Sequence, residues 1–146
     1  MISTVEEILQ RKGREVWTIG PKDTVLDALK IMAAKDIGAL VVVHEGQLVG
    51  IISERDYARK IVLKGKASIS TRVKDIMTEK VYYVTPKTTI LECQALLTDK
   101  SVRHLPVMDQ GKMVGLISIG DVVKAIIDEQ EITISQLSDY ITGKYI

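Results

Sequence analysis

The sequence of 146 residues contains one cysteine, Cys93, and no long apolar run. A single thiol can form neither an internal disulfide nor a multi-cysteine metal site, which is typical of a protein from a reducing compartment. The longest apolar stretches, such as residues 39–43, fall far short of the ~20 residues needed to cross a bilayer. The N-terminus carries early acids and lacks the basic-then-apolar order of a signal peptide. We therefore expect a cytoplasmic protein without a membrane partner.

An excess of charge of one sign is also missing. Twenty Lys and Arg residues stand against 19 Asp and Glu residues, and no dense basic run offers a footprint for a phosphate backbone. Nucleic acid is therefore not an expected partner. The two histidines and Cys93 show no metal-ligand spacing, and no nucleophile is paired with a base. We expect neither a metal site nor enzymatic activity.

An internal repeat organises the chain. A shift of 65 positions aligns residues 16–61 with residues 81–126 without a gap, and about 15 of the 46 pairs are identical. The segments that lead into the repeats, Val5–Leu9 and Val73–Met77, also correspond. We divide the chain into residues 1–72, one repeat with its leading helix and linker, and residues 73–146, the second repeat with a C-terminal helix. One copy alone has a thin core, so we expect two pseudo-twofold copies packed into one module around a cleft.

Each copy has the predicted order strand, helix, strand, strand, helix, an α/β (α+β) fold. The first helices begin at the capping-box spacings Thr24-x-x-Asp27 and Thr89-x-x-Glu92, and the β-branched runs flank glycine-bearing turns that predict hairpins. The predicted strands are 16–19, 39–43 and 48–53, repeated as 81–84, 105–108 and 113–118. The later helices are predicted over residues 54–63 and 119–129, with an amphipathic last helix over 132–141.

The best-matched segments of the two copies are residues 50–56 and 115–121, which share the pattern Gly-x-Ile-Ser-x-x-Asp. Helix capping alone explains Ser-x-x-Asp. A helix start can also bind phosphate through free backbone amides, and an aspartate can accept hydrogen bonds from two ribose hydroxyls. Arg55 would add a bidentate phosphate donor, and Gly50 and Gly115 leave room for backbone or ligand to approach. Both interpretations stay open from the residues alone.

These motifs, in this order and duplicated at a fixed offset, resemble the tandem cystathionine-β-synthase (CBS) domain pair over nearly the whole chain. The resemblance rests on Val73-Lys-Asp-Ile-Met-Thr, Val84-Thr-Pro, Arg103-His-Leu-Pro-Val and the two Ser-x-x-Asp turns. It implies a stand-alone energy or metabolite sensor that binds an adenosine ligand, with AMP first and ADP, ATP, NAD or S-adenosylmethionine as alternatives. It also implies no catalytic cofactor, a homodimer, and a regulated protein that the sequence does not identify.

The resemblance further implies roles for individual residues. Asp56 and Asp121 would hold ribose hydroxyls, Ser53 and Ser118 would meet phosphate or ribose, and Arg103 with His104 would face phosphate. Strand-end residues would frame the adenine. The full expected ligand set is Thr18, Ile19, Gly38, Ala39, Ser53, Arg55, Asp56, Val84, Thr85, Arg103, His104, Pro106, Ser118, Gly120 and Asp121.

The two copies differ at these positions, so their sites should differ in affinity. Gly38 and Ala39 stand where the second copy has Arg103 and His104, and Arg55 stands where it has Gly120. A ligand-free interaction or dimerisation scaffold remains the alternative function. His104 can equally be an ordinary, partly buried histidine. Plainer roles are also expected elsewhere. Cys93 is expected to be a core residue. Trp17 is expected to be a core or dimer contact, with an adenine contact as the lesser alternative. Lys60 is expected on a solvated helix face, with a phosphate-binding rim as the lesser alternative.

Overall fold

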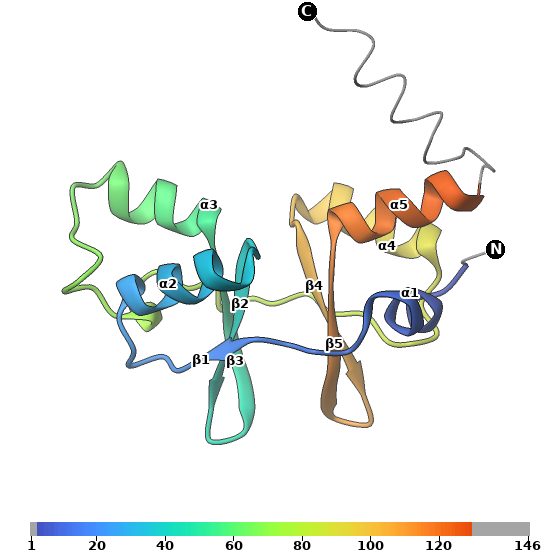
Figure 1. Cartoon of the computed structure of the whole chain (residues 1–146), viewed down its shortest axis with the longest axis horizontal. Helices are drawn as coiled ribbons and strands as arrows, with labels where there is room; N and C mark the ends of the chain where they lie inside the picture. Colours follow the sequence, from blue (N-terminus) through green and yellow to red (C-terminus); the bar gives the residue numbers. More distant parts are fainter. Residues whose placement is uncertain (1–2, 130–146) are drawn as a thin grey trace, which may run out of the picture. The chain divides into compact units, whose positions relative to one another are not determined.

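The computed structural model describes residues 3–129 of the chain (Figure 1). The chain forms two compact units, Glu15–Tyr82 and Met1–Arg14 with Tyr83–Ile146. We call them the β1–β3 unit and the β4–β5 unit. The predicted last helix over residues 132–141 lies outside the described residues.

The β1–β3 unit contains a three-stranded sheet in the order β1-β2-β3, with β1 parallel to β2 and β2 antiparallel to β3. The helix α2 connects β1 to β2, and β3 leads into α3, which continues as a π-helical segment, η1. The elements are β1 (Thr18–Ile19), α2 (Val25–Lys35), β2 (Ala39–His44), β3 (Gln47–Ser53), α3 (Glu54–Tyr57), η1 (Ala58–Val62) and the 3₁₀ helix η2 (Val73–Asp75).

The β4–β5 unit repeats this plan with an antiparallel hairpin of β4 and β5. The two strands of the hairpin and the helices before and after it match the predicted repeat. The elements are α1 (Val5–Lys12), α4 (Ile90–Lys100), β4 (His104–Asp109), β5 (Lys112–Ser118) and α5 (Ile119–Glu129). The mixed helix and strand fold with two repeats is therefore confirmed.

Both predicted hairpins turn in the same way. Glu45 and Gly46 have φ angles of 50° and 79°, and Gln110 and Gly111 have 51° and 78°. Two consecutive left-handed residues form the two-residue turn whose twist suits antiparallel strands. Glycine at the second position accepts this geometry without a Cβ penalty. The turns are shorter than the predicted connections, so the strands extend closer to the glycines.

The predicted strand over residues 81–84 is reduced to one parallel bridge between Val84 and Val107. In the other unit, the amide of Val41 donates to the carbonyl of Trp17 at 3.3 Å, which extends the pairing of β1 with β2. Pro106 occupies the position of Val41 in the second repeat. Proline has no amide hydrogen to donate, so the corresponding hydrogen bond cannot form and the strand is shorter.

The segments that lead into the repeats are exchanged between the compact units. In the β4–β5 unit, the amides of Val5 and Glu6 donate to the carbonyls of Thr88 and Pro86, both at 2.9 Å. The α1 helix therefore lies with the second repeat, beside β5 and α5 (Figure 1). Val5, Ile8 and Leu9 are at most 4% exposed and complete that core.

The β1–β3 unit receives the other leading segment at equivalent positions. The amides of Val73 and Lys74 donate to the carbonyls of Asp23 and Pro21 at 2.8 and 2.9 Å. Val73 and Ile76 are buried in the core of this unit. The sequence repeat divides the chain at residues 72 and 73, whereas each compact unit is completed by the apolar residues that precede the other repeat.

Cys93 is fully buried in α4, as expected for a core residue. Burial, with a smaller contribution from the charge of Glu92, raises the pKa of its thiol to about 11. The thiol therefore stays protonated at neutral pH, and a thiolate nucleophile is not formed there. Trp17 packs against the core of the β1–β3 unit, with the ammonium of Lys35 4.1 Å from its ring centre.

Candidate functional site

The first predicted serine–aspartate turn connects β3 to α3. Ser53 ends the strand, and its Oγ accepts a hydrogen bond from the amide of Asp56 at 3.2 Å. The Asp56 carboxylate returns the contact, because its Oδ2 accepts from the amide of Ser53 at 3.0 Å. The capping box is thus confirmed, and it fixes the carboxylate at the beginning of the helix.

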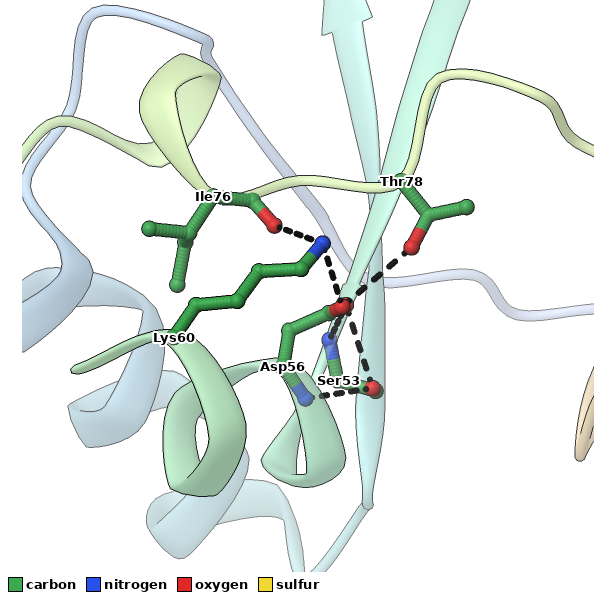
Figure 2. A network of polar contacts seen from close by, with 5 residues as sticks. All are labelled: Ser53, Asp56, Lys60, Ile76 and Thr78. Atoms are coloured by element: carbon green, nitrogen blue, oxygen red, sulfur yellow. Dashed lines mark hydrogen bonds and ion pairs between the residues drawn. The ribbon is translucent and has the colours of Figure 1, made fainter. Parts of the chain in front are cut away.

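Asp56 has further partners from two other segments (Figure 2). The hydroxyl of Ser53 also donates to Oδ2 at 3.2 Å, and Oδ1 accepts from the Thr78 hydroxyl at 3.2 Å. Lys60 Nζ lies 3.0 Å from Oδ1 and donates to the carbonyl of Ile76 at 2.8 Å. Four donors fill the roughly four lone-pair sites of a carboxylate. A ribose that bound Asp56 would therefore have to displace one of these groups.

The second turn connects β5 to α5. The amide of Asp121 donates to Ser118 Oγ at 3.2 Å, and the amide of Ser118 donates to Asp121 Oδ2 at 2.8 Å. The remaining contact comes from α1, because Lys12 Nζ donates to the same Oδ2 at 2.7 Å and to the carbonyl of Leu116 at 2.9 Å. Within residues 3–129, no hydrogen bond reaches Asp121 Oδ1.

The two carboxylates therefore differ in availability. The side chain of Asp121 is 23% exposed and that of Asp56 is 11% exposed. Asp121 has two donors on one oxygen, whereas Asp56 has donors on both oxygens. Of the two turns, the one at Asp121 offers the more accessible acceptor.

The glycines before each turn make room for the chain itself. A Cβ on Gly50 would lie 2.7 Å from Met77 Sδ and 3.0 Å from the carbonyl of Thr78, and one on Gly115 would lie 2.7 Å from Leu9 Cδ2. The exchanged leading segments thus fill the space that was expected to admit backbone or ligand. For Gly50 the expectation of a backbone approach is confirmed, but a ligand in either space is not compatible with these contacts.

The expected ligand residues of the β1–β3 unit gather only in part. Ala39 lies opposite Ser53 in the sheet, and the amide of Glu54 donates to the carbonyl of Gly38 at 3.0 Å, which brings these residues beside Asp56. Thr18 and Ile19 lie further along, opposite Val41 and Val42. Ile19 packs in the core, so its side chain does not form an open apolar wall. Arg55 is exposed on the first turn of α3.

In the β4–β5 unit, the residues at equivalent positions of the repeat lie together in the same way. His104 lies opposite Ser118, and the amide of Ile119 donates to the carbonyl of Arg103 at 2.8 Å. Gly120 is exposed on the first turn of α5. The other three expected residues lie along β4 or beyond it: Pro106 is buried in the strand, Val84 pairs with Val107, and Thr85 donates from its amide to Thr88 Oγ1 at 3.0 Å.

His104 faces a charged environment. Burial lowers the pKa of its imidazole first, and the positive charge of Lys12 lowers it further. Asp121 raises this pKa, and Arg103 lowers it again. Together these effects leave the pKa of His104 below its ordinary value. His104 is therefore neutral at pH 7 and presents one N–H donor rather than a cation.

The lowered pKa of His104 predicts a loss of stability in acid. The unfolded chain takes up the proton near the ordinary pKa of about 6.5, before the folded chain does. The free energy of unfolding should therefore fall as the pH drops below this value, until the folded-state pKa is passed. Urea unfolding between about pH 5 and pH 7.5 measures the slope. His104→Gln should flatten this slope, and an equal slope in the wild type and in His104→Gln would contradict the prediction.

Sequence reasoning missed three side chains at the turns. Lys12 and Thr78 lie outside the aligned repeat, and Lys60 was expected on a solvated face, although it is bonded to Asp56 and to the Ile76 carbonyl. Lys12 and Thr78 lie in the leading segments, just after the stretch over which these segments correspond, which ends at Leu9 and Met77. Their contacts with the turns can be predicted only when it is known which repeat each leading segment packs against.

No three His, Cys, Asp or Glu side chains among residues 3–129 form a group that could hold a metal ion. None of the helices in the described part has the length and apolar composition needed to cross a membrane.

Comparison with known proteins gives consistent matches. The family model of the CBS domain matches residues 5–63 and 73–128. The CBS domain-containing protein CBSX3, mitochondrial, of Arabidopsis thaliana is 44% identical over 153 residues, covering 98% of this chain and 74% of the relative. A solved structure from Burkholderia ambifaria, named for CBS domains and a role in signal transduction, is 53% identical, with a TM-score of 0.85 and coverage of 90% of this chain and 98% of that one.

A further solved structure shares the fold and contains ligands. The CBS domain pair of protein MJ0100, in complex with 5′-methylthioadenosine and S-adenosyl-L-methionine, has a TM-score of 0.78 at 24% identity. The match covers 88% of this chain and 99% of that chain.

Proposed function

We propose, from the premise that this chain belongs to the CBS-domain family as a pair of CBS domains, that it is a regulatory module that binds an adenosine-containing ligand. AMP is the first ligand we propose, with ADP, ATP, NAD and S-adenosylmethionine as alternatives. The complex of the MJ0100 domain pair with two adenosine compounds supports this ligand class. No catalytic step or catalytic cofactor is part of the proposal.

The observation that carries the proposal is the state of the Asp121 carboxylate. The capping box and Lys12 hold Oδ2, while Oδ1 accepts no hydrogen bond from the described residues and the side chain is 23% exposed. Adjacent ribose hydroxyls are donors that a fixed carboxylate recognises. Arg103, His104 and Ser118 lie at the same end of the hairpin. They could receive the phosphate of a nucleotide.

Regulation would follow from a shift between conformations of the chain. A ligand that binds one conformation better increases its population, and a partner that prefers that conformation responds. The partner is not identified by the described residues. Homodimerisation stays a prediction. The cytoplasmic location also stays one, and the Arabidopsis relative is named as mitochondrial.

Calorimetric titration with AMP tests the ribose assignment. Asp121→Asn should weaken AMP binding about 10-fold or more, because a hydrogen bond to a charged group is worth about 1.5–3 kcal/mol. The amide keeps the size of the side chain, so the turn should persist. Asp109→Asn, at the opposite end of the hairpin, should bind AMP as the wild type does. AMP affinity that is unchanged in Asp121→Asn and in the double variant with Asp56→Asn would refute the ribose role of both carboxylates.

One observation favours the scaffold as a second candidate function. Asp56 is saturated by protein donors, which is the state expected of a purely structural carboxylate. The scaffold function predicts no heat on titration with AMP, ATP, NAD or S-adenosylmethionine. It also predicts no adenosine compound among the small molecules that co-purify with the protein and are identified by mass spectrometry.

A further inference from the structure

We propose that Lys12 makes the Asp121 site selective for a nucleotide that carries a phosphate. In the free chain, Lys12 neutralises Asp121, and on binding its ammonium transfers to the phosphate while the ribose hydroxyls take over the carboxylate. This inference rests on the proposed function and deepens it by naming the ligand class: a nucleoside phosphate, in preference to an uncharged nucleoside.

The position of Lys12 follows from the docking of α1. Leu9 is 1% exposed and packs over Gly115, which anchors the helix on β5. Lys12 lies three residues later, on the same face of the helix. Its Nζ consequently reaches the carbonyl of Leu116 and Asp121 Oδ2. Arg11, the neighbouring residue, forms an ion pair with Asp128 of α5 and holds the end of α1 to the same helix as Asp121.

The corresponding contacts in the β1–β3 unit are made by fixed groups. Ile51 is the repeat equivalent of Leu116, and its carbonyl accepts from the backbone amide of Thr78 at 2.8 Å. Thr78 then donates its hydroxyl to Asp56. A backbone bridge and a short hydroxyl cannot leave without disrupting the sheet edge. Lys12 performs both tasks with one flexible side chain that is 36% exposed, so it can leave Asp121 while the backbone stays in place.

Lys60, the lysine that contacts Asp56, is not equivalent to Lys12. Lys60 lies one turn after Asp56 on the same helical segment and is tied to the carbonyl of Ile76 as well. Its repeat equivalent is Ala125, which is buried and has no donor. Among the described residues, Asp121 therefore depends on Lys12 alone for its counter-cation.

The surroundings of Lys12 favour an anionic group on the ligand. Lys12 contacts Asp121, His104 lies opposite Ser118 in the hairpin, and the carbonyl of Arg103 accepts from the amide of Ile119, so these residues lie near the turn that holds Asp121. In the β1–β3 unit, Gly38 and Ala39 replace Arg103 and His104. If two adjacent ribose hydroxyls bind both carboxylate oxygens of Asp121, the hydroxyl on Oδ2 displaces Lys12, which then lacks a partner. A phosphate nearby supplies a new charge-assisted contact, which an uncharged nucleoside lacks.

Titration with two probes, AMP and adenosine, tests the inference. The wild type should bind AMP more tightly than adenosine. Lys12→Met, which keeps the length and apolar stem, should weaken AMP binding about 10-fold or more. It should leave adenosine binding unchanged or slightly tighter, since no ammonium then competes with the ribose for Asp121. Lys12→Arg, which keeps the positive charge, should retain the preference for AMP that Lys12→Met loses. Lys112→Met is the matched control, because it removes the same charge at the far end of the β4–β5 hairpin.

A second readout uses the wild-type chain and does not depend on a variant that folds. The NMR signal of the Lys12 side-chain nitrogen should shift when AMP is added, in a manner distinct from the shift with adenosine. An AMP-to-adenosine preference that is the same in the wild type and Lys12→Met, or a Lys12 signal that responds equally to both probes, would overturn this inference and leave the proposed function intact. A wild type that binds neither probe would overturn both.

Discussion

Leu9→Ala is expected to lower the free energy of unfolding by about 2–5 kcal/mol, the cost of emptying a packed core position. Leu9 is 1% exposed, and it lies in α1, near the beginning of the chain. Its contacts are nevertheless with the second repeat, because it fills the space over Gly115. The loss should therefore fall on the β4–β5 unit. Urea unfolding measures the magnitude, and hydrogen exchange resolved by residue locates it.

Gln10→Ala is the control for Leu9→Ala, because Gln10 is the exposed neighbour on the same helix. It should change the free energy of unfolding by no more than about 0.5 kcal/mol. Amide protection in Leu9→Ala should fall in β4 and β5 and be retained in β2 and β3. Loss of protection confined to β2 and β3 would show that α1 completes its own repeat, contrary to the structure.

Gly115→Ala should also destabilise the chain, by about 1–3 kcal/mol, because the added methyl group overpacks the core. The new Cβ would lie 2.7 Å from Leu9 Cδ2, and a buried leucine has little freedom to move away. In the Leu9→Ala background the same methyl group enters a cavity, so it should cost little or stabilise. The double-mutant cycle should give a coupling of at least about 1 kcal/mol between the two positions.

Gly50→Ala provides the comparison that separates side-chain from backbone crowding. Its Cβ would meet Met77 Sδ at 2.7 Å and also the Thr78 carbonyl at 3.0 Å. Met77→Ala should therefore relieve only part of the cost of Gly50→Ala, whereas Leu9→Ala should relieve most of the cost of Gly115→Ala. Thermal and urea unfolding of the two cycles measure this. Additive effects at positions 9 and 115 would show that Leu9 does not occupy the space over Gly115.

Features set by neighbouring residues could be predicted from the sequence. The hairpins and the helix starts follow from the β-branched runs, the glycines at the turns and the serine or threonine caps, and the structure contains them. The strand over residues 81–84 was predicted too long, because the restriction comes from Pro106 on the partner strand. A pairing partner distant in the sequence is not visible in the pattern of the strand itself.

The exchange of leading segments could not be predicted, and the reason is the repeat itself. The docking positions at Pro21 and Asp23 and at Pro86 and Thr88 are equivalent, so the pattern of either segment fits both. For the candidate site, the capping contacts of Asp56 and Asp121 were predictable. Their contacts with Thr78 and Lys12 were not, because they depend on this exchange.

The exchange also sets an order for folding during synthesis. Residues 15–82 emerge as one uninterrupted stretch that already holds Val73 and Ile76 for its own core. This half can close before the rest of the chain is made, as domains generally do on the ribosome. The α1 helix is translated before residues 15–82 but reaches its partners only after residues 83–129 have followed. Its apolar face, Val5, Ile8 and Leu9, therefore lacks its core partners for longer than Val73 and Ile76 do.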